Sequence, residues 1–248
     1  MRSGVLVVTG GSRGIGAAAV REAAEAGWSV CFSYRTDVNA ARVLTDHSRR
    51  AGVEIRAVRA DMTDERDIVS LFACAADLGP VTGLVANAGI VAERRRVEEL
   101  DAARVRHVFE VNVVAPLLCC REAVPMMSTR RGGRGGSIVL VSSAASRIGS
   151  PGEYVDYAAS KAAVDTLGLG LAKEVAAEGI RVNVVRPGII DTELHASGGQ
   201  PDRASELAAR LPLGRPGTAG EVASAIVWLL SEKASYCTGS ILDVAGGR

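Results

Sequence analysis

The sequence predicts an α/β fold in which helices cover both faces of a doubly wound, seven-stranded parallel sheet. Short apolar runs alternate with longer amphipathic segments along all 248 residues, which is typical of repeated strand–helix units. Aromatic residues make up only 4% of the chain and hydrophobic residues 48%, so aliphatic side chains must fill the core, as in layered α/β proteins. No linker or low-complexity stretch divides the chain. We therefore expect a single domain spanning residues 1–248.

The predicted strands are short runs dominated by aliphatic residues. The first, VLVV at 5–8, is apolar at every position, as expected of a strand that is buried on both faces of a parallel sheet. The predicted helices are longer segments with apolar residues at three- and four-residue spacing. In chain order, strands are expected at 5–8, 29–32, 55–59, 84–86, 137–141, 182–185 and 240–244, and helices at 15–26, 38–50, 65–76, 102–127, 157–177 and 220–230.

Composition excludes several classes of function. The 29 basic and 28 acidic residues leave a formal charge of +1, too little to attract nucleic acid or an anionic membrane nonspecifically. The five cysteines contain no C-x-x-C pair, and three histidines have no metal-ligand spacing, so neither a disulfide framework nor a metal site is predicted. No segment approaches the ~18 apolar residues of a membrane span, nor a signal sequence, and a cytoplasmic protein is expected.

A glycine-rich turn follows the first strand. The residues Thr9-Gly-Gly-Ser-Arg-Gly-Ile-Gly16 lead directly into a helix, whose unpaired N–H groups and positive dipole end favour a phosphate. Glycines allow a tight turn and a close approach of the backbone. Taken alone, the motif is equally compatible with a purely structural turn.

Polar and turn residues also follow other predicted strands. In an open parallel sheet, ligands bind outside the carboxyl ends of the strands, so residues at those ends are expected to share one site. These residues are Thr9 and Gly10, Asp61, Asn87-Ala88-Gly89, Ser142-Ser143 and Pro187-Gly188.

Tyr157 and Lys161 stand four residues apart at the start of a predicted helix, which places the phenol and the ammonium on one face. Ser143 lies just upstream, at a strand end. This trio suits proton transfer at a carbonyl or an alcohol. A tyrosine that ionises near neutral pH needs its pKa lowered by ~3 units from ~10, or ~4 kcal/mol. A nearby ammonium supplies that much only in a largely dehydrated pocket, which we therefore expect.

In their order along the whole chain, these motifs resemble the short-chain dehydrogenase/reductase family, whose single-domain members fold as a Rossmann sheet. Thr238-Gly239 and Gly246-Gly247 complete the pattern near the end of the chain. The resemblance implies that Tyr157 is the catalytic acid/base, that Lys161 lowers its pKa, that Ser143 holds the substrate oxygen and that Asn112 anchors a proton relay; on sequence alone, Asn112 is also compatible with simple helix packing. It further implies a dinucleotide site formed by Gly10, Ser12, Arg13, Gly14, Ile15, Gly16, Arg35, Asp61, Met62, Asn87, Ala88, Gly89, Tyr157, Lys161, Pro187, Gly188, Ile190 and Thr192.

The cofactor is expected to be NADP(H). Arg13 lies in the phosphate turn, and Arg35 follows the second strand, where an acidic residue would otherwise bind the ribose hydroxyl of NAD. Asp37 nearby leaves NAD possible. The substrate is expected to be a small carbonyl compound or alcohol, and the chain resembles both glucose-dehydrogenase-like and acyl-carrier-reductase-like bacterial branches. The alternative is a nonenzymatic NAD(P)-binding regulator on the same fold, because fold does not fix function.

Two further expectations concern surfaces. The segment 191–217 is rich in Gly and Pro, and it is predicted to be a mobile lid in which Leu207, Leu211 and Leu213 close over the pocket. The predicted helices 102–127 and 157–177 are apolar around most of their circumference and must bury more than one face. By resemblance, we expect a homotetramer.

Overall fold

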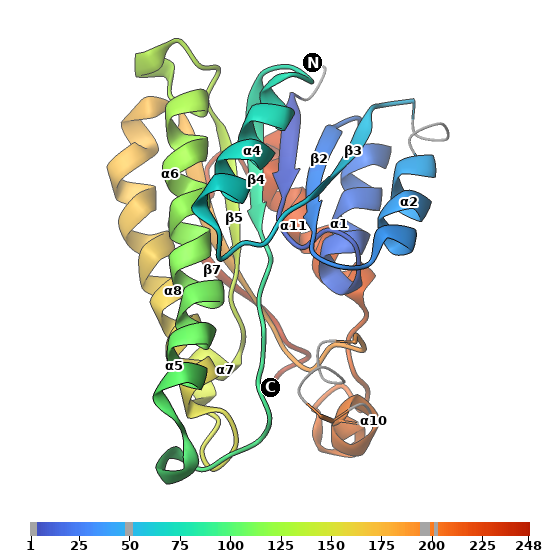
Figure 1. Cartoon of the computed structure of the whole chain (residues 1–248), viewed down its shortest axis with the longest axis vertical. Coiled ribbons are helices and arrows are strands. Elements are labelled where there is room, and N and C mark those ends of the chain that lie inside the picture. The colour runs from blue at the N-terminus through green and yellow to red at the C-terminus, as the bar shows by residue number, and fades with distance from the viewer. Residues whose placement is uncertain (1–3, 48–51, 194–198, 201–202) are drawn as a thin grey trace.

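The computed structural model describes residues 4–47, 52–193, 199–200 and 203–248. Seven parallel strands form one sheet in the order β3-β2-β1-β4-β5-β6-β7. The predicted Rossmann-type fold is therefore confirmed (Figure 1). The strands are β1 (Val5–Val8), β2 (Ser29–Tyr34), β3 (Ile55–Arg59), β4 (Val81–Ala86), β5 (Gly136–Val141), β6 (Ile180–Pro187) and β7 (Ile241–Val244).

Helices cover both faces of the sheet (Figure 1). Alternate side chains of β1 point to opposite faces, so Val5 and Val7 pack with one set of helices and Leu6 and Val8 with the other. All four are buried, which accounts for the uniformly apolar sequence of this strand. The first set is α4 (Glu65–Ala76), α6 (Ala115–Met127) and α8 (Val155–Val175), and the second is α1 (Gly14–Glu25), α2 (Val38–Asp46) and α11 (Ala219–Leu230).

The helix expected at 102–127 is interrupted. It consists of α5 (Ala102–Phe109), a π-helical segment (Glu110–Val114) and α6. Pro116 has no N–H to donate to the carbonyl of Asn112, a bond that an uninterrupted α-helix requires, and the N–H of Ala115 donates to Glu110, five residues back. The break therefore falls at Asn112.

Other boundaries also differ from those predicted. β2 is two residues longer at its C-terminal end, and β4 begins at Val81 because two further residues pair with the sheet. The structure adds the short helices α7 (Ala145–Ile148) and α10 (Arg203–Leu207). Residues 48–50, at the end of the second predicted helix, lie outside the described part of the chain.

The proposed lid, 191–217, is only partly described, since residues 194–198 and 201–202 lie outside the described ranges. Ile190 pairs with Gly217 in an isolated bridge, which closes the base of the segment. Leu211 is buried in a small apolar cluster with Ile189, and Leu207 is partly buried against the same cluster. Leu213 is 66% exposed. The closure of this segment over the pocket stays a prediction.

In the ranges given above, no helix is long and apolar enough to cross a bilayer.

Candidate active site

A cleft of about 560 Å³ lies at the carboxyl ends of the strands. Its lining comes from the turn after β1, the ends of β2 to β6 and the first turns of α8. Nearly all of the site residues predicted from sequence line this cleft; Gly16 and Asn112 instead lie buried behind it. Side chains and backbone from positions as far apart as residues 10 and 192 therefore share one site.

The glycine-rich turn is fastened to the end of β4. The Thr9 hydroxyl accepts hydrogen bonds from the backbone N–H groups of Asn87 and Ala88, both at 3.0 Å. The Asn87 side-chain amide donates to the carbonyls of Thr9 and Gly10, at 3.0 and 3.1 Å. Asn87 therefore fixes the shape of the turn.

The geometry of this turn fits a phosphate group. A Cβ on Gly16 would stand 2.2 Å from the Gly10 carbonyl oxygen, and Gly14 has a φ of +53°, so both positions require glycine. Among the described residues, no side chain caps the N-terminus of α1, and its first turn contains no acidic residue. The N–H groups there are positioned to receive an anion.

The far end of the cleft is lined by residues that follow β2 and β3. Arg35 lies close enough to Asp61 to lower the pKa of that carboxyl, although hydrogen bonds from Thr63 are the larger cause. The Asp37 carboxylate caps α2 by accepting from the N–H of Ala40 at 2.9 Å. Ser33, Tyr34 and Thr36 also line this end and were not among the predicted site residues.

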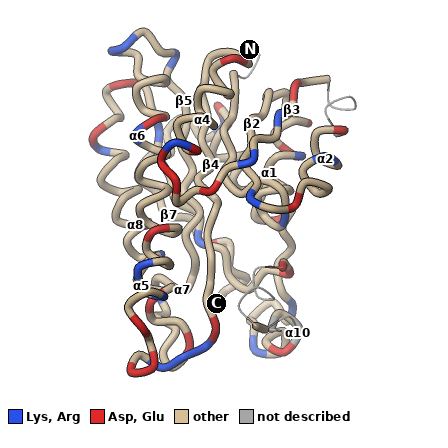
Figure 2. The backbone as a smooth tube through the Cα atoms, in the orientation of Figure 1, with Lys and Arg blue, Asp and Glu red and all other residues tan. Residues whose placement is uncertain are grey.

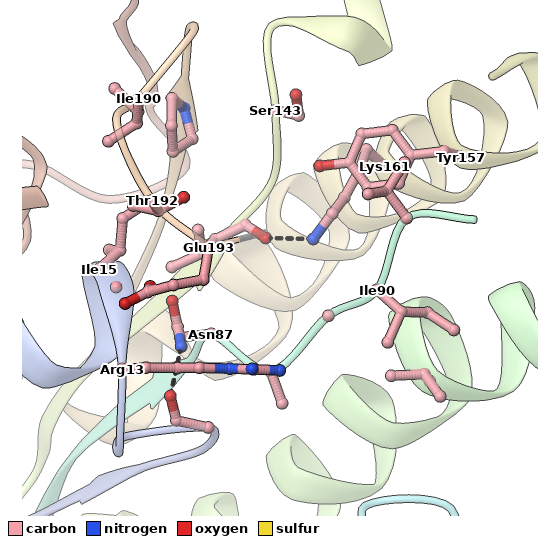
Figure 3. Close-up of a pocket in the computed structure, with 18 of the residues that line it drawn as sticks. Arg13, Ile15, Asn87, Ile90, Ser143, Tyr157, Lys161, Ile190, Thr192 and Glu193 are labelled. Atoms are coloured by element: carbon pink, nitrogen blue, oxygen red, sulfur yellow. Dashed lines mark hydrogen bonds between the residues drawn. The ribbon is translucent and has the colours of Figure 1, made fainter. Parts of the chain in front are cut away.

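At the opposite end, Ser143, Tyr157 and Lys161 lie close together, facing Thr192 across the cleft (Figure 3). Ser143 follows β5, and Tyr157 and Lys161 occupy successive turns of α8. The ammonium of Lys161 lies 5.8 Å from the centre of the Tyr157 ring and donates to the Val141 carbonyl at 2.8 Å.

The pKa values of this group differ from our expectation. The protein around the Tyr157 phenol raises its pKa, because desolvation outweighs a hydrogen bond with Ser143. The Tyr157 ring reaches the cleft, but protein surrounds it closely. Burial also lowers the pKa of Lys161 to about 8, against the opposing effect of Asp165. The net shift of the Tyr157 pKa is therefore upward, opposite to the lowering that we expected.

Asn112 lies buried behind the residues that line the cleft. Its side chain accepts from the N–H of Ile90 at 2.9 Å and donates to the Ile90 carbonyl at 3.0 Å. It also donates to the hydroxyl of Ser160, at 3.0 Å, which donates in turn to the carbonyl of Tyr157 at 2.7 Å. Asn112 thus joins the π-helical segment to α8 and to the extended segment that follows β4, residues 87–96, here called the strap.

Several lining residues were missed. Ser150 and Tyr154 come from the connection between β5 and α8, and the Tyr154 hydroxyl donates to Gln200 at 2.7 Å. Glu193 and Arg248 reach the cleft from distant parts of the chain and had no local sequence signal. His107, one of the three histidines without metal-ligand spacing, also lines the cleft.

Three consecutive arginines, at positions 94–96, are paired with acids. Arg94 contacts Glu153 at 2.7 Å and Arg95 contacts Glu93 at 3.4 Å, and Arg96 pairs with Glu98. Figure 2 shows this basic stretch next to acidic positions at the lower end of the molecule. It is therefore a region of mixed charge.

Comparisons with known proteins agree with this fold and site. The family model described as enoyl-(acyl carrier protein) reductase matches residues 10–248. The uncharacterized oxidoreductase YgfF of Escherichia coli is 51% identical over 98% of this chain and 99% of its own. The cis-4-hydroxycyclohexanecarboxylate dehydrogenase of Sinomonas cyclohexanicum is 41% identical over 98% and 95%. A blue fluorescent protein from a metagenomic library, solved in complex with NADPH, superposes with a TM-score of 0.89 at 34% identity, over 98% of this chain and 97% of that one.

The fold and the cleft thus define an α/β oxidoreductase. The chain belongs to the short-chain dehydrogenase/reductase family, whose named relatives are dehydrogenases and reductases acting on alcohol or carbonyl groups. These relatives favour the enzyme over the nonenzymatic regulator.

Proposed function

We propose that the protein is an NADP(H)-dependent oxidoreductase that interconverts a small carbonyl compound and its alcohol, with Tyr157 as the acid/base. The observation that carries the proposal is the convergence of Ser143, Tyr157 and Lys161 at one end of a cleft whose other end holds the glycine-rich turn. A phosphate-binding turn and a proton donor within one cleft are the two parts that hydride transfer to a carbonyl requires.

The residues of the cleft suit a dinucleotide. The N-terminus of α1, with Gly10 and Gly14, would receive the pyrophosphate, and Asp61 and Met62 would contact the adenine. Lys161 would bond the nicotinamide ribose, while Ile190 and Thr192 would bound the nicotinamide end. The bound cofactor would supply the hydride.

Proton transfer falls to the residues of the chain. In carbonyl reduction, the Tyr157 hydroxyl donates its proton to the substrate oxygen, and the Ser143 hydroxyl donates a hydrogen bond to the same oxygen. The positive charge of Lys161 stabilises the phenolate that remains. A phenol that protein surrounds closely and whose pKa is raised is protonated at neutral pH, which suits the acid role.

A substrate screen tests the proposal. Ketones, aldehydes and alcohols, including cis-4-hydroxycyclohexanecarboxylate, the substrate named for the Sinomonas relative, would be followed through NADPH absorbance. Turnover of at least one secondary alcohol or its ketone is expected. Tight NADPH binding with no turnover across the panel would favour the regulator.

Cofactor preference gives a separate prediction. Arg13 and Arg35 are both exposed at the cleft, where either guanidinium can pair with the 2′-phosphate of NADP(H). Arg35→Ala is expected to weaken NADPH binding about tenfold and to leave NADH binding nearly unchanged, because a charge-assisted hydrogen bond is lost only with NADPH. Binding titrations followed by fluorescence measure both. Arg42→Ala, which removes a charge from an exposed part of α2, is the control. Equal effects on both cofactors would contradict the prediction.

Association is predicted from exposed apolar residues on adjacent helices. Val114, Leu117 and Leu169 are 37%, 47% and 39% exposed along the π-helical segment, α6 and α8. Trp228 on α11 adds a second exposed apolar position, 41% exposed. Burying such faces favours closed symmetric assembly. Light scattering at micromolar concentration is expected to give the mass of a tetramer. The mass of a monomer would refute the prediction. The mass of a dimer would mean that only one of the two apolar faces forms an interface.

A further inference from the structure

A buried carboxylate, that of Asp165, lies one helical turn beyond Lys161. Asp165 follows it by four residues on α8, so the two side chains share a face of the helix. Both are nearly inaccessible, with Lys161 4% and Asp165 5% exposed. At this burial, a charge on one group acts strongly on the other, since little water screens them.

Asp165 is held by an arginine from the sheet. Arg186, near the end of β6, donates to one Asp165 oxygen through Nη2 at 2.7 Å and Nε at 3.0 Å. The other oxygen, Oδ1, is buried and has no hydrogen-bond partner among the described residues. Both hydrogen bonds from Arg186 therefore go to one oxygen of this carboxylate, and the other oxygen accepts none from the described residues.

The groups around Lys161 leave Asp165 as its dominant counter-charge. On α8, Lys161 lies beside the neutral phenol of Tyr157. The Lys161 ammonium also bonds the carbonyl of Val141, at the end of β5. Arg186 is the charged residue of β6 that contacts Asp165, whereas Arg181 of the same strand bonds the carbonyls of Leu229 and Cys237. Beyond Arg186, Asp243 of β7 lies 3.9 Å from the Arg186 guanidinium. The carboxylate of Glu193 lies toward Gly14, on the other side of the cleft. The effect of Asp165 on Lys161 opposes that of burial.

We propose that Asp165 and Arg186 form a positioning pair that sets how firmly Lys161 keeps its positive charge at the cleft. The negative charge of Asp165 favours the charged form of Lys161. The positive charge of Arg186, bonded to the same carboxylate, weakens that effect. The meaning of this pair for catalysis rests on the proposed function, but its effect on the charge of Lys161 does not. Neither residue touches the cleft, and both act through Lys161.

The pair predicts opposite consequences for two substitutions that break the same ion pair. Asp165→Asn keeps the shape and an acceptor oxygen but removes the negative charge, so Lys161 should lose its proton at lower pH. Arg186→Gln keeps a donor but removes the positive charge, so Lys161 should hold its proton to higher pH. Each shift is expected to be about one pH unit. Arg186→Lys retains the charge and should leave the titration close to that of the unaltered protein.

The titration can be measured directly, because the chain contains only three lysines. Full-length protein labelled with [ε-¹³C]lysine would be titrated by NMR without cofactor, with the exposed Lys173 and Lys233 as internal references. Lys161→Met assigns its resonance. Shifts of opposite sign for Asp165→Asn and Arg186→Gln support the proposal. Shifts of the same sign, or none, overturn it, because a merely structural pair would make both variants behave alike.

Kinetics then separates this inference from the proposed function. The alkaline limb of kcat/KM should move down in Asp165→Asn and up in Arg186→Gln. If the NMR shifts are opposite but Tyr157→Phe still turns over normally, the pair is real and the catalytic assignment is wrong. If Tyr157→Phe is inactive and the NMR shifts are absent, the catalytic assignment stands and the pair is only structural.

Discussion

Tyr157→Phe is expected to lower kcat/KM for carbonyl reduction by roughly 10²- to 10⁴-fold, the range typical of the loss of a positioned acid. The substitution removes the hydroxyl that bonds with Ser143 and leaves the ring beside Lys161. Cofactor affinity should stay within a few-fold, because neither the glycine-rich turn nor Lys161 changes. Steady-state kinetics and a cofactor titration on the same preparation measure the two effects separately.

Tyr236→Phe is the matched control. This tyrosine is fully exposed and does not line the cleft, so the same loss of a hydroxyl should leave turnover unchanged. Near-normal turnover in Tyr157→Phe would place the proton donor elsewhere.

The raised pKa of Tyr157 also predicts how rate depends on pH. Reduction needs the protonated phenol, which burial stabilises, so its rate should be level across neutral pH and fall only in alkali. Alcohol oxidation needs the ionised phenol, so its rate should rise with pH through the neutral range. Initial rates in both directions between pH 6 and 10 test this; an oxidation rate that is already maximal at pH 6 would contradict it.

Arg104→Met is expected to cost about 3 kcal/mol of stability, because removing one partner leaves a buried carboxylate unpaired. Arg104 on α5 bonds Asp156 through Nε at 2.8 Å and Nη2 at 3.3 Å, and the two side chains are only 10% and 2% exposed. For a chain of this length, the loss corresponds to a fall in Tm of roughly 6 to 12 °C. Thermal unfolding followed by circular dichroism measures it.

The same pair holds the end of α8 that carries Tyr157. Asp156 accepts from the backbone N–H of Tyr157 at 2.9 Å, and Arg104 also donates to the Glu93 carbonyl in the strap after β4, at 2.6 Å. Arg104→Met should therefore lower kcat as well as stability. Arg106→Met, on the exposed side of the same helix, is the control, and Asp156→Asn combined with Arg104→Met should recover much of the lost stability. Additive losses in the double variant would show that the two side chains act independently.

The layers of this fold could be predicted from sequence because they depend on local patterns. The alternation of strands and helices, the buried VLVV strand and the two apolar faces all follow from the spacing of side chains along the chain. The interruption at Asn112 escaped prediction although Pro116 stands inside the predicted helix 102–127, because an interior proline can kink a helix without ending it. Its effect became clear only where the Asn112 side chain meets Ile90.

Sequence by itself determined the family, the parallel sheet and the residues that gather at its carboxyl ends, because chain direction in a parallel sheet brings those ends to one edge. Tertiary structure alone decided the environment of Tyr157, the proposed proton donor. Burial raises the pKa of Tyr157, the ammonium of Lys161 is directed to Val141, and Arg186 approaches Asp165 from a strand that is distant in sequence. Electrostatic effects depend on which charges meet and how much water remains between them, and both are set by packing between segments far apart in the chain.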